Sequence, residues 1–213
     1  MRIFLMILCL FLSFSKGVQA QDGTFNLMIF GDSLSAGYKL SAEDSFYSQL
    51  QKTLLDKGYD NVKVINASVV GDTTQRGLDR IDRALAQNPH AVLLELGIND
   101  MLQGASLATT RANLEKIIET FQDNDVSVML VGMMAPPQAS YEGRTEFTQM
   151  YKDLAKKYDL TFYPFFMEGV IKQTFGVYST KYLLDDGAHP NAQGVQIMVK
   201  NIYPTVEKFL LNQ

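Results

Sequence analysis

Short apolar runs alternate with amphipathic segments along most of the chain, and this alternation constrains the fold more than any other feature. The short runs are typical of strands buried on both faces, and the longer segments are typical of crossover helices. The expected strands cover residues 27–30, 62–65, 91–96, 126–131 and 160–165. The expected helices cover about residues 45–57, 74–87, 106–122, 146–158 and 191–211, the last one kinked or restarted at Pro204. Because such crossovers are right-handed, we predict a three-layer α/β/α sandwich around a parallel sheet of about five strands.

The first twenty residues have the pattern of a secretory signal peptide. Arg2 supplies the positive start, residues 3–14 are apolar, and residues 18–20 (Val-Gln-Ala) predict cleavage before Gln21. The apolar stretch is too short for a stable membrane anchor, although an uncleaved anchor is the alternative. We therefore expect a protein that is periplasmic or secreted.

Length and composition predict a single domain that covers residues 21–213. A domain of this length can bury a core. Cys9 is the only cysteine and lies within the expected signal, so the remaining chain can form no intramolecular disulfide. Loss of Arg2 and Lys16 would change the net charge from -4 to about -6. Since lysines and arginines are scattered, we expect no nucleic-acid partner.

The chain has two histidines, and histidine is the side chain that most readily exchanges protons near neutral pH. His90 precedes the third expected strand, which is the wrong end of a parallel sheet for chemistry, so we interpret it as a surface or strand-edge residue. His189 follows Asp186 by three residues. One turn can direct that carboxylate at one ring nitrogen and leave the other free. Asp185 is the competing acid, one residue farther away.

Ser33 lies at the carboxyl end of the first expected strand, where ligands bind in open α/β sheets. Gly31 allows a tight turn there, and Ser33 is then a nucleophile or a helix cap. Gly71 follows the second strand and Asn99 the third, so a backbone N–H and a side-chain amide could join the Ser33 N–H in binding an oxyanion. A turn residue and a loop former are the respective alternatives. We interpret Asp32 as structural.

Four segments resemble, in order, the four sequence blocks of the GDSL/SGNH hydrolase family. They are Gly31-Asp32-Ser33-Leu34-Ser35, Gly71-Asp72-Thr73, Gly97-Ile98-Asn99-Asp100 and Asp186-Gly187-Ala188-His189. The resemblance covers nearly the whole chain after residue 20 and is strongest for the bacterial periplasmic thioesterase I, lysophospholipase L1 and arylesterase group. Ile98 departs from this group, which often has a second glycine there, and this leaves the size of the substrate open.

The resemblance implies a flavodoxin-like fold and a serine esterase that works through an acyl-enzyme. Carried over position by position, it implies that Ser33 is the nucleophile, His189 the base and Asp186 the acid that orients His189. It also implies that Ser33, Gly71 and Asn99 donate to the oxyanion.

Apolar residues in the loops at the same sheet edge predict a groove for an acyl chain, with ordinary loop packing as the alternative. The candidate substrate contacts are Met101, Leu102, Met134, Pro136 and Tyr141, with Met133, Pro137 and Phe175 as further members of the group. Residues 134–141 form the longest expected irregular segment and would flank the leaving group.

We therefore expect a monomeric hydrolase of small-molecule acyl esters or thioesters, including lysophospholipids, without metal, cofactor or stable membrane anchor. A carbohydrate O-acetylesterase on the same fold is the alternative enzyme. The absence of tryptophan, a common sugar platform, weighs modestly against it. A non-catalytic binding protein is the alternative from another class.

Overall fold

The computed structural model describes residues 23–136, 139–171, 173–174, 177–178 and 180–213. The expected signal segment lies outside the described residues, as do Pro137 and Phe175 of the expected acyl groove.

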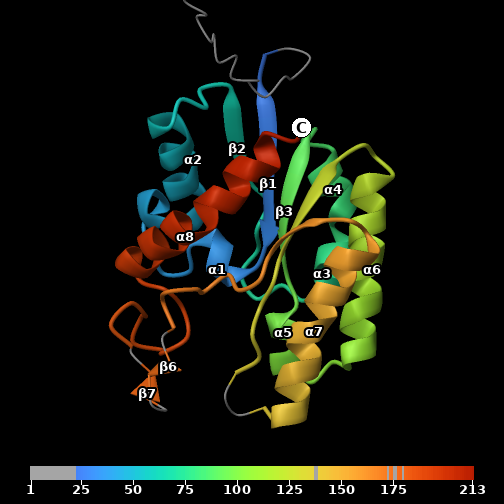
Figure 1. Ribbon diagram of the computed structural model, residues 1–213, viewed down its shortest axis with the longest axis vertical. Coiled ribbons are helices and arrows are strands. Elements are labelled where there is room, and N and C mark those ends of the chain that lie inside the picture. The colour runs from blue at the N-terminus through green and yellow to red at the C-terminus, as the bar shows by residue number, and fades with distance from the viewer. Residues whose placement is uncertain (1–22, 137–138, 172, 175–176, 179) are drawn as a thin grey trace, which may run out of the picture.

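A five-stranded parallel sheet with strand order β2-β1-β3-β4-β5 forms the middle layer (Figure 1). The strands are β1 (Phe25–Gly31), β2 (Val62–Asn66), β3 (Ala91–Glu95), β4 (Ser127–Val131) and β5 (Thr161–Tyr163). In the parallel register, Leu27 of β1 lies opposite Val64 of β2 and Ala91 of β3. All carboxyl ends therefore lie at one edge, the lower edge in Figure 1. This confirms the expected α/β architecture and its flavodoxin-like order.

Helices cover both faces of the sheet and complete the three layers (Figure 1). On one face, α2 (Phe46–Asp56) packs against α8 (Ala192–Leu210). The other face carries α3 (Thr74–Asp79), α4 (Ile81–Leu85), α6 (Leu107–Gln122) and α7 (Tyr141–Lys157). Short elements in the loops are α1 (Ser33–Ala36), the 3₁₀ helix η1 (Ala42–Asp44), α5 (Ile98–Leu102), and the antiparallel pair β6 (Gln173–Thr174) and β7 (Val177–Tyr178).

Apolar burial on both faces holds the layers together. All five residues of β3 are buried, as expected for a central strand of a parallel sheet. Phe30 of β1 packs edge to face on Phe121 of α6, with ring centroids 5.4 Å apart, and Phe46 of α2 packs on Phe166 at 4.8 Å. Such burial contributes about 25 cal/mol per Å² of apolar surface, so the strand ends are held firmly beneath the loops that follow them.

The helix expected over residues 74–87 is wrong in one respect, because the chain breaks into α3 and α4 at Arg80. The backbone of Arg80 has φ -115° and ψ 11°, outside the helical range. Its guanidinium bonds Asp72 and backbone carbonyls on other segments, and apolar periodicity does not report such long-range contacts.

Two further helices differ from expectation at one end or in the interior. The start of α7 is Tyr141 instead of residue 146, because the Ser140 side chain accepts a hydrogen bond from the Gly143 N–H and caps the helix. Tyr141 is therefore helical and does not belong to an irregular segment. α8 continues through Pro204 without restarting, and the buried side chains of Ile202 and Val206 hold it against the core on both sides of the proline.

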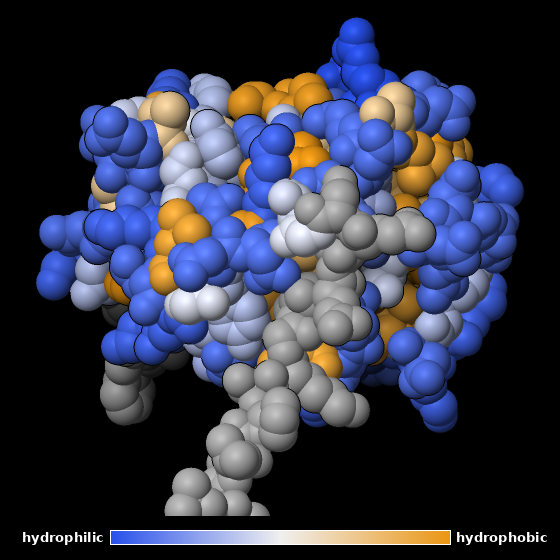
Figure 2. All heavy atoms as spheres, turned by 90° about the horizontal axis from the view of Figure 1, so that it is seen from above, coloured by the Kyte–Doolittle hydropathy of each residue, from blue (hydrophilic) through white to orange (hydrophobic). Residues whose placement is uncertain are grey.

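The face at the amino ends of the strands is mostly hydrophilic, and its apolar residues form separate small groups (Figure 2). Across the described part of the chain, no helix combines the length and apolar character needed to span a membrane.

Candidate active site

Ser33 begins α1 directly after β1 and is only 7% exposed. Asp32 caps this helix, since its carboxylate accepts a hydrogen bond from the Leu34 N–H at 3.0 Å. Gly31 does not have the positive φ of a tight glycine turn. It is instead required by close packing, because a Cβ there would collide with the side chains of Ser35 and Glu95.

A chain of two hydrogen bonds joins Ser33, His189 and Asp186. Ser33 Oγ lies 2.9 Å from His189 Nε2, and His189 Nδ1 lies 3.0 Å from Asp186 Oδ2. An ionised carboxylate can only accept, so Nδ1 carries the proton and Nε2 is left to accept from the serine hydroxyl. This is the arrangement in which an imidazole can remove a proton from a serine.

The Asp186 carboxylate is held in its charged form. Its Oδ1 accepts hydrogen bonds from the N–H groups of Ala188 and His189, both at 3.0 Å. Desolvation acts to raise the pKa of Asp186, but the two N–H groups and the imidazole outweigh it and lower this pKa to about 2. The partner of His189 is thus Asp186 and not Asp185.

The loop that carries His189 is fixed at both ends. Gly187 has φ +68°, a conformation that favours glycine, and the Leu184 N–H donates to the His189 carbonyl at 2.8 Å. Asn191 caps α8, and its amide also donates to the carbonyls of Lys181 and Leu183. The imidazole is therefore presented from a rigid turn.

Two backbone N–H groups near Ser33 are available for a ligand. Within the described residues, neither the Ser33 N–H nor the Gly71 N–H has an acceptor. Gly71 has φ +79°, and a Cβ built on it would meet no atom within 4 Å. The positive φ, and not lack of space for a side chain, is therefore the reason that this turn favours glycine.

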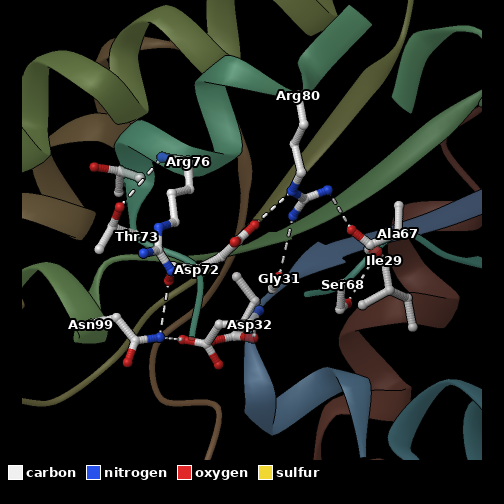
Figure 3. A network of polar contacts seen from close by, with 12 residues as sticks. Ile29, Gly31, Asp32, Ala67, Ser68, Asp72, Thr73, Arg76, Arg80 and Asn99 are labelled. Carbon is white, nitrogen blue, oxygen red and sulfur yellow. Dashed lines mark hydrogen bonds and ion pairs between the residues drawn. The ribbon is translucent and has the colours of Figure 1, made fainter. Parts of the chain in front are cut away.

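Asn99, at the start of α5, lies differently from expectation. Its Nδ2 donates to Asp32 Oδ2 at 3.0 Å and to the Asp72 carbonyl at 2.9 Å (Figure 3). Both amide hydrogens thus already have acceptors inside the protein. Donation to an oxyanion would require one of these hydrogens to be shared between two acceptors.

His90 is at the opposite end of the sheet, beside the start of β3. Its Nδ1 accepts a hydrogen bond from the Asn26 N–H at 2.9 Å, and its ring stacks on Phe25 with centroids 5.1 Å apart. These contacts give His90 the strand-edge role expected from its position.

A buried carboxyl beneath Ser33 was missed by the sequence analysis. Glu95 Oε2 accepts hydrogen bonds from Ser35 Oγ at 2.5 Å and from the Asp32 N–H at 3.3 Å, while its Oε1 has no partner within the described residues. Burial raises the pKa of Glu95 well above its usual range, and the charge of Asp32 adds to this rise, so the neutral acid is favoured. The sequence feature that could have identified Glu95 is its position as a single charged residue inside an otherwise apolar run.

Two further residues join the site through contacts that the sequence does not reveal. The Asp100 carboxylate accepts hydrogen bonds from the Thr74 N–H at 2.7 Å and from the Thr74 hydroxyl, which ties the loop after β3 to the start of α3.

The Tyr38 ring packs against the His189 ring. Tyr38 lies in the run that follows Ser33 and could have been found from its aromatic character.

The candidate substrate contacts are only partly exposed to a ligand. Leu102, Met134 and Tyr141 are exposed, and Met101 and Pro136 are half-buried. Met133 is buried in the core, so its inclusion in the groove is wrong, because its side chain packs inward after β4. Two cavities of about 610 and 480 Å³ lie along α8, and their lining includes none of these residues. Val69 and Val70, in the loop after β2, are also exposed.

At the carboxyl edge of a parallel sheet, a serine meets a histidine, and this combination of fold and site is that of a serine hydrolase. Comparison with known proteins leads to the same class. The model of the GDSL-like lipase/acylhydrolase family matches residues 29–197. An arylesterase from Vibrio mimicus is 38% identical over 89% of this chain and 90% of its own length. Thioesterase 1/protease 1/lysophospholipase L1 of Escherichia coli is 35% identical, covering 84% of each chain. The crystal structure of TesA superimposes with a TM-score of 0.79 at 33% identity, over 86% of this chain and 98% of that one.

The chain therefore belongs to the GDSL-like lipase/acylhydrolase family, and it is a serine esterase. The resemblance inferred from the four sequence blocks is confirmed.

Proposed function

We propose that Ser33, His189 and Asp186 form the catalytic triad of an esterase that cleaves carboxylic esters, including thioesters, through an acyl-enzyme. The observation that supports this is the hydrogen-bonded chain from Ser33 Oγ through the imidazole to the Asp186 carboxylate. It lies at the edge of the sheet where the loops after β1, β2 and β3 meet.

Acylation begins when Ser33 Oγ attacks the carbonyl carbon and His189 Nε2 accepts the hydroxyl proton. Asp186 stabilises the imidazolium that forms. The carbonyl oxygen becomes an oxyanion, which the N–H groups of Ser33 and Gly71 and the amide of Asn99 bind. The tetrahedral intermediate then collapses, His189 returns the proton to the leaving alcohol or thiol, and the acyl group stays on Ser33.

Deacylation repeats these steps with water. His189 removes a proton from a water molecule as its oxygen attacks the acyl carbon, and the same donors bind the second oxyanion. Collapse releases the carboxylic acid and returns the proton to Ser33 Oγ. The proposed cycle uses no metal and no cofactor.

The proposed substrates carry an apolar acyl chain, and lysophospholipids are among them. The support is a set of exposed apolar residues in the loops at the carboxyl edge of the sheet and at the start of α7: Val69, Val70, Leu102, Met134 and Tyr141. Apolar side chains in loops around a reactive serine favour an acyl chain over a sugar. A carbohydrate O-acetylesterase is the alternative activity.

The test is covalent labelling followed by a substrate panel. A fluorophosphonate probe should label the protein at Ser33, and the Ser33→Ala variant should be neither labelled nor active. The panel should contain p-nitrophenyl esters, acyl-CoAs, lysophospholipids and acetylated sugars. Turnover of acetylated sugars alone would favour the alternative activity, and absence of labelling would favour a binding protein.

Export to the periplasm or beyond is also part of the proposal, and it rests on the N-terminal sequence pattern. Expression of the full chain with its first twenty residues, followed by N-terminal sequencing of the exported protein, should give Gln21 as the first residue. Size-exclusion chromatography with light scattering tests the expected monomer.

A further inference from the structure

Arg80 lies at the break between α3 and α4, and its guanidinium points toward the loops that follow β1 and β2 (Figure 3). Nε donates to Asp72 Oδ2 at 2.6 Å, Nη1 to the Ala67 carbonyl at 2.6 Å and Nη2 to the Gly31 carbonyl at 3.3 Å. The guanidinium carbon also lies 3.9 Å from the centre of the Phe30 ring. One side chain therefore binds the end of β1 and both ends of the loop after β2 at once.

These two segments border the proposed oxyanion site. Gly31 ends β1 and leads directly to Asp32 and Ser33, and Asp72 follows Gly71 in the next loop. The Asp72 carbonyl also accepts a hydrogen bond from the Asn99 amide. Arg80 is thus bonded to the segments that carry the Ser33 and Gly71 N–H groups, and it is linked to Asn99 through Asp72.

Charge gives Arg80 a second effect on the same site. The side chain of Asp72 is only 5% exposed, and its carboxylate forms an ion pair with Arg80. A buried carboxylate without a cationic partner is strongly unfavourable. Without the arginine, the negative charge of Asp72 would lie unpaired in the loop that is proposed to bind the oxyanion, and it would oppose the charge that develops there.

We propose that Arg80 is a positioning residue for the oxyanion site, holding the Gly71–Asp72 turn against the end of β1. This inference rests on the proposed esterase function. An arginine is required because its planar fork donates in three directions while its face packs on Phe30, and a lysine ammonium cannot make this combination of contacts. Arg80 does not touch the reacting atoms. Its effect on catalysis passes through the donors that it holds.

The experiment compares Arg80→Ala and Arg80→Lys with Arg83→Ala. Arg83 is exposed and lies on α4, about one turn farther along the chain, so it is a matched control. Values of kcat and KM should be measured per active site titrated with the fluorophosphonate probe, which excludes unfolded protein from the count. The melting temperature should be measured on the same preparations.

Arg80→Ala should lower kcat about 10–100-fold with KM changed only a few-fold, since the loss falls on the transition state. Arg80→Lys should remain impaired, because it restores the charge but not the fork. Guanidinium ion at millimolar concentration should restore part of the kcat of Arg80→Ala, whereas ammonium should not. Arg83→Ala should retain kcat and show no response to guanidinium.

A lower melting temperature with kcat per titrated site within about twofold of wild type would show that Arg80 only stabilises the fold, and would overturn the inference. If Arg80→Ala does not fold, the kcat per titrated site of Arg80→Lys relative to wild type decides the question, with the same limit of about twofold. Failure of the proposed function is distinguishable, because an unlabelled Ser33 or a fully active Ser33→Ala variant would reject the esterase mechanism independently of Arg80.

Discussion

The ring of Tyr38 lies against the ring of His189, with centroids 4.4 Å apart and an angle of 43° between the planes. The His189 ring is thus held on one side by Asp186, through a hydrogen bond, and on another by an aromatic face. Tyr38 is itself fixed, because its N–H donates to the Ser33 carbonyl at 3.2 Å. The contact therefore connects the segment of the nucleophile to the orientation of the base.

Replacement of Tyr38 by leucine should lower kcat about 2–10-fold, since an aromatic pair of this kind contributes about 0.5–1.5 kcal/mol beyond its buried area. Tyr38→Phe keeps the ring and should retain nearly full activity. Steady-state kinetics on both variants measures the difference. If Tyr38→Phe lost as much activity as Tyr38→Leu, the hydroxyl and not the ring packing would be the important group.

The two histidines should differ sharply in their effect on turnover. His189→Ala should lower kcat by about 10⁵–10⁶, as Ser33→Ala should, and the double variant should be little worse because the two residues act as a unit. His90→Ala should leave kcat within a few-fold and lower the melting temperature, because it removes the acceptor of the Asn26 N–H. An inactive, well-folded His90→Ala protein would contradict the assignment of the active edge.

Asn99→Ala should lower kcat by about 10²–10³ with a smaller effect on KM, if the amide donates to the oxyanion in the transition state. Asn99→Asp should be at least as harmful, because a carboxylate would repel both the oxyanion and Asp32. The amide also bonds Asp32 and Asp72, so a purely structural role predicts a lower melting temperature with nearly unchanged kcat. Measurement of both quantities on one preparation decides between the roles.

Stability should depend on pH through Asp32. Desolvation by burial raises the pKa of Asp32 from 3.8 to about 7; the Leu34 N–H opposes this rise, and the charges of Asp72 and Asp100 reinforce it. Between about pH 4 and pH 7 the folded protein therefore keeps a proton that the unfolded chain has lost. The contribution of Asp32 to the free energy of unfolding should therefore fall as the pH rises through this window and level off above it.

Denaturant unfolding across this pH range should show a shallower decline for Asp32→Asn than for the wild type. Glu95 contributes a decline of the same sign in both proteins, but Asp32→Asn also removes the charge that raises the pKa of Glu95. The difference between the two curves therefore reports the Asp32 carboxyl together with its effect on Glu95. Asp60→Asn, at an exposed position in the loop before β2, is the control and should follow the wild-type curve. Identical slopes for all three proteins would show that Asp32 is ionised throughout the range.

Most elements of the fold and most residues of the candidate site could be predicted from the sequence alone. Apolar periodicity reports burial, so the five strands and the main helices could be located, and the right-handed crossover rule then placed Ser33, Gly71, Asn99 and His189 at one edge of the sheet. The start expected for the helix at residue 106 also agrees with the structure, where Ser106 caps α6. The family resemblance, which has the acid three residues before the histidine, also selected Asp186 correctly, and the contact lies within one turn of chain.

Only the tertiary structure decided how the segments are fastened around Ser33. Three hydrogen bonds join residues that are distant in sequence or separated by a turn. They run from Arg80 to the loop after β2, from Glu95 to the helix of the nucleophile, and from the Asn99 amide to Asp32. Gly31 was assigned to a tight turn, whereas close packing requires it. Periodicity describes which face of an element is buried. It does not report which distant polar group meets which, because that depends on the packing of all three layers.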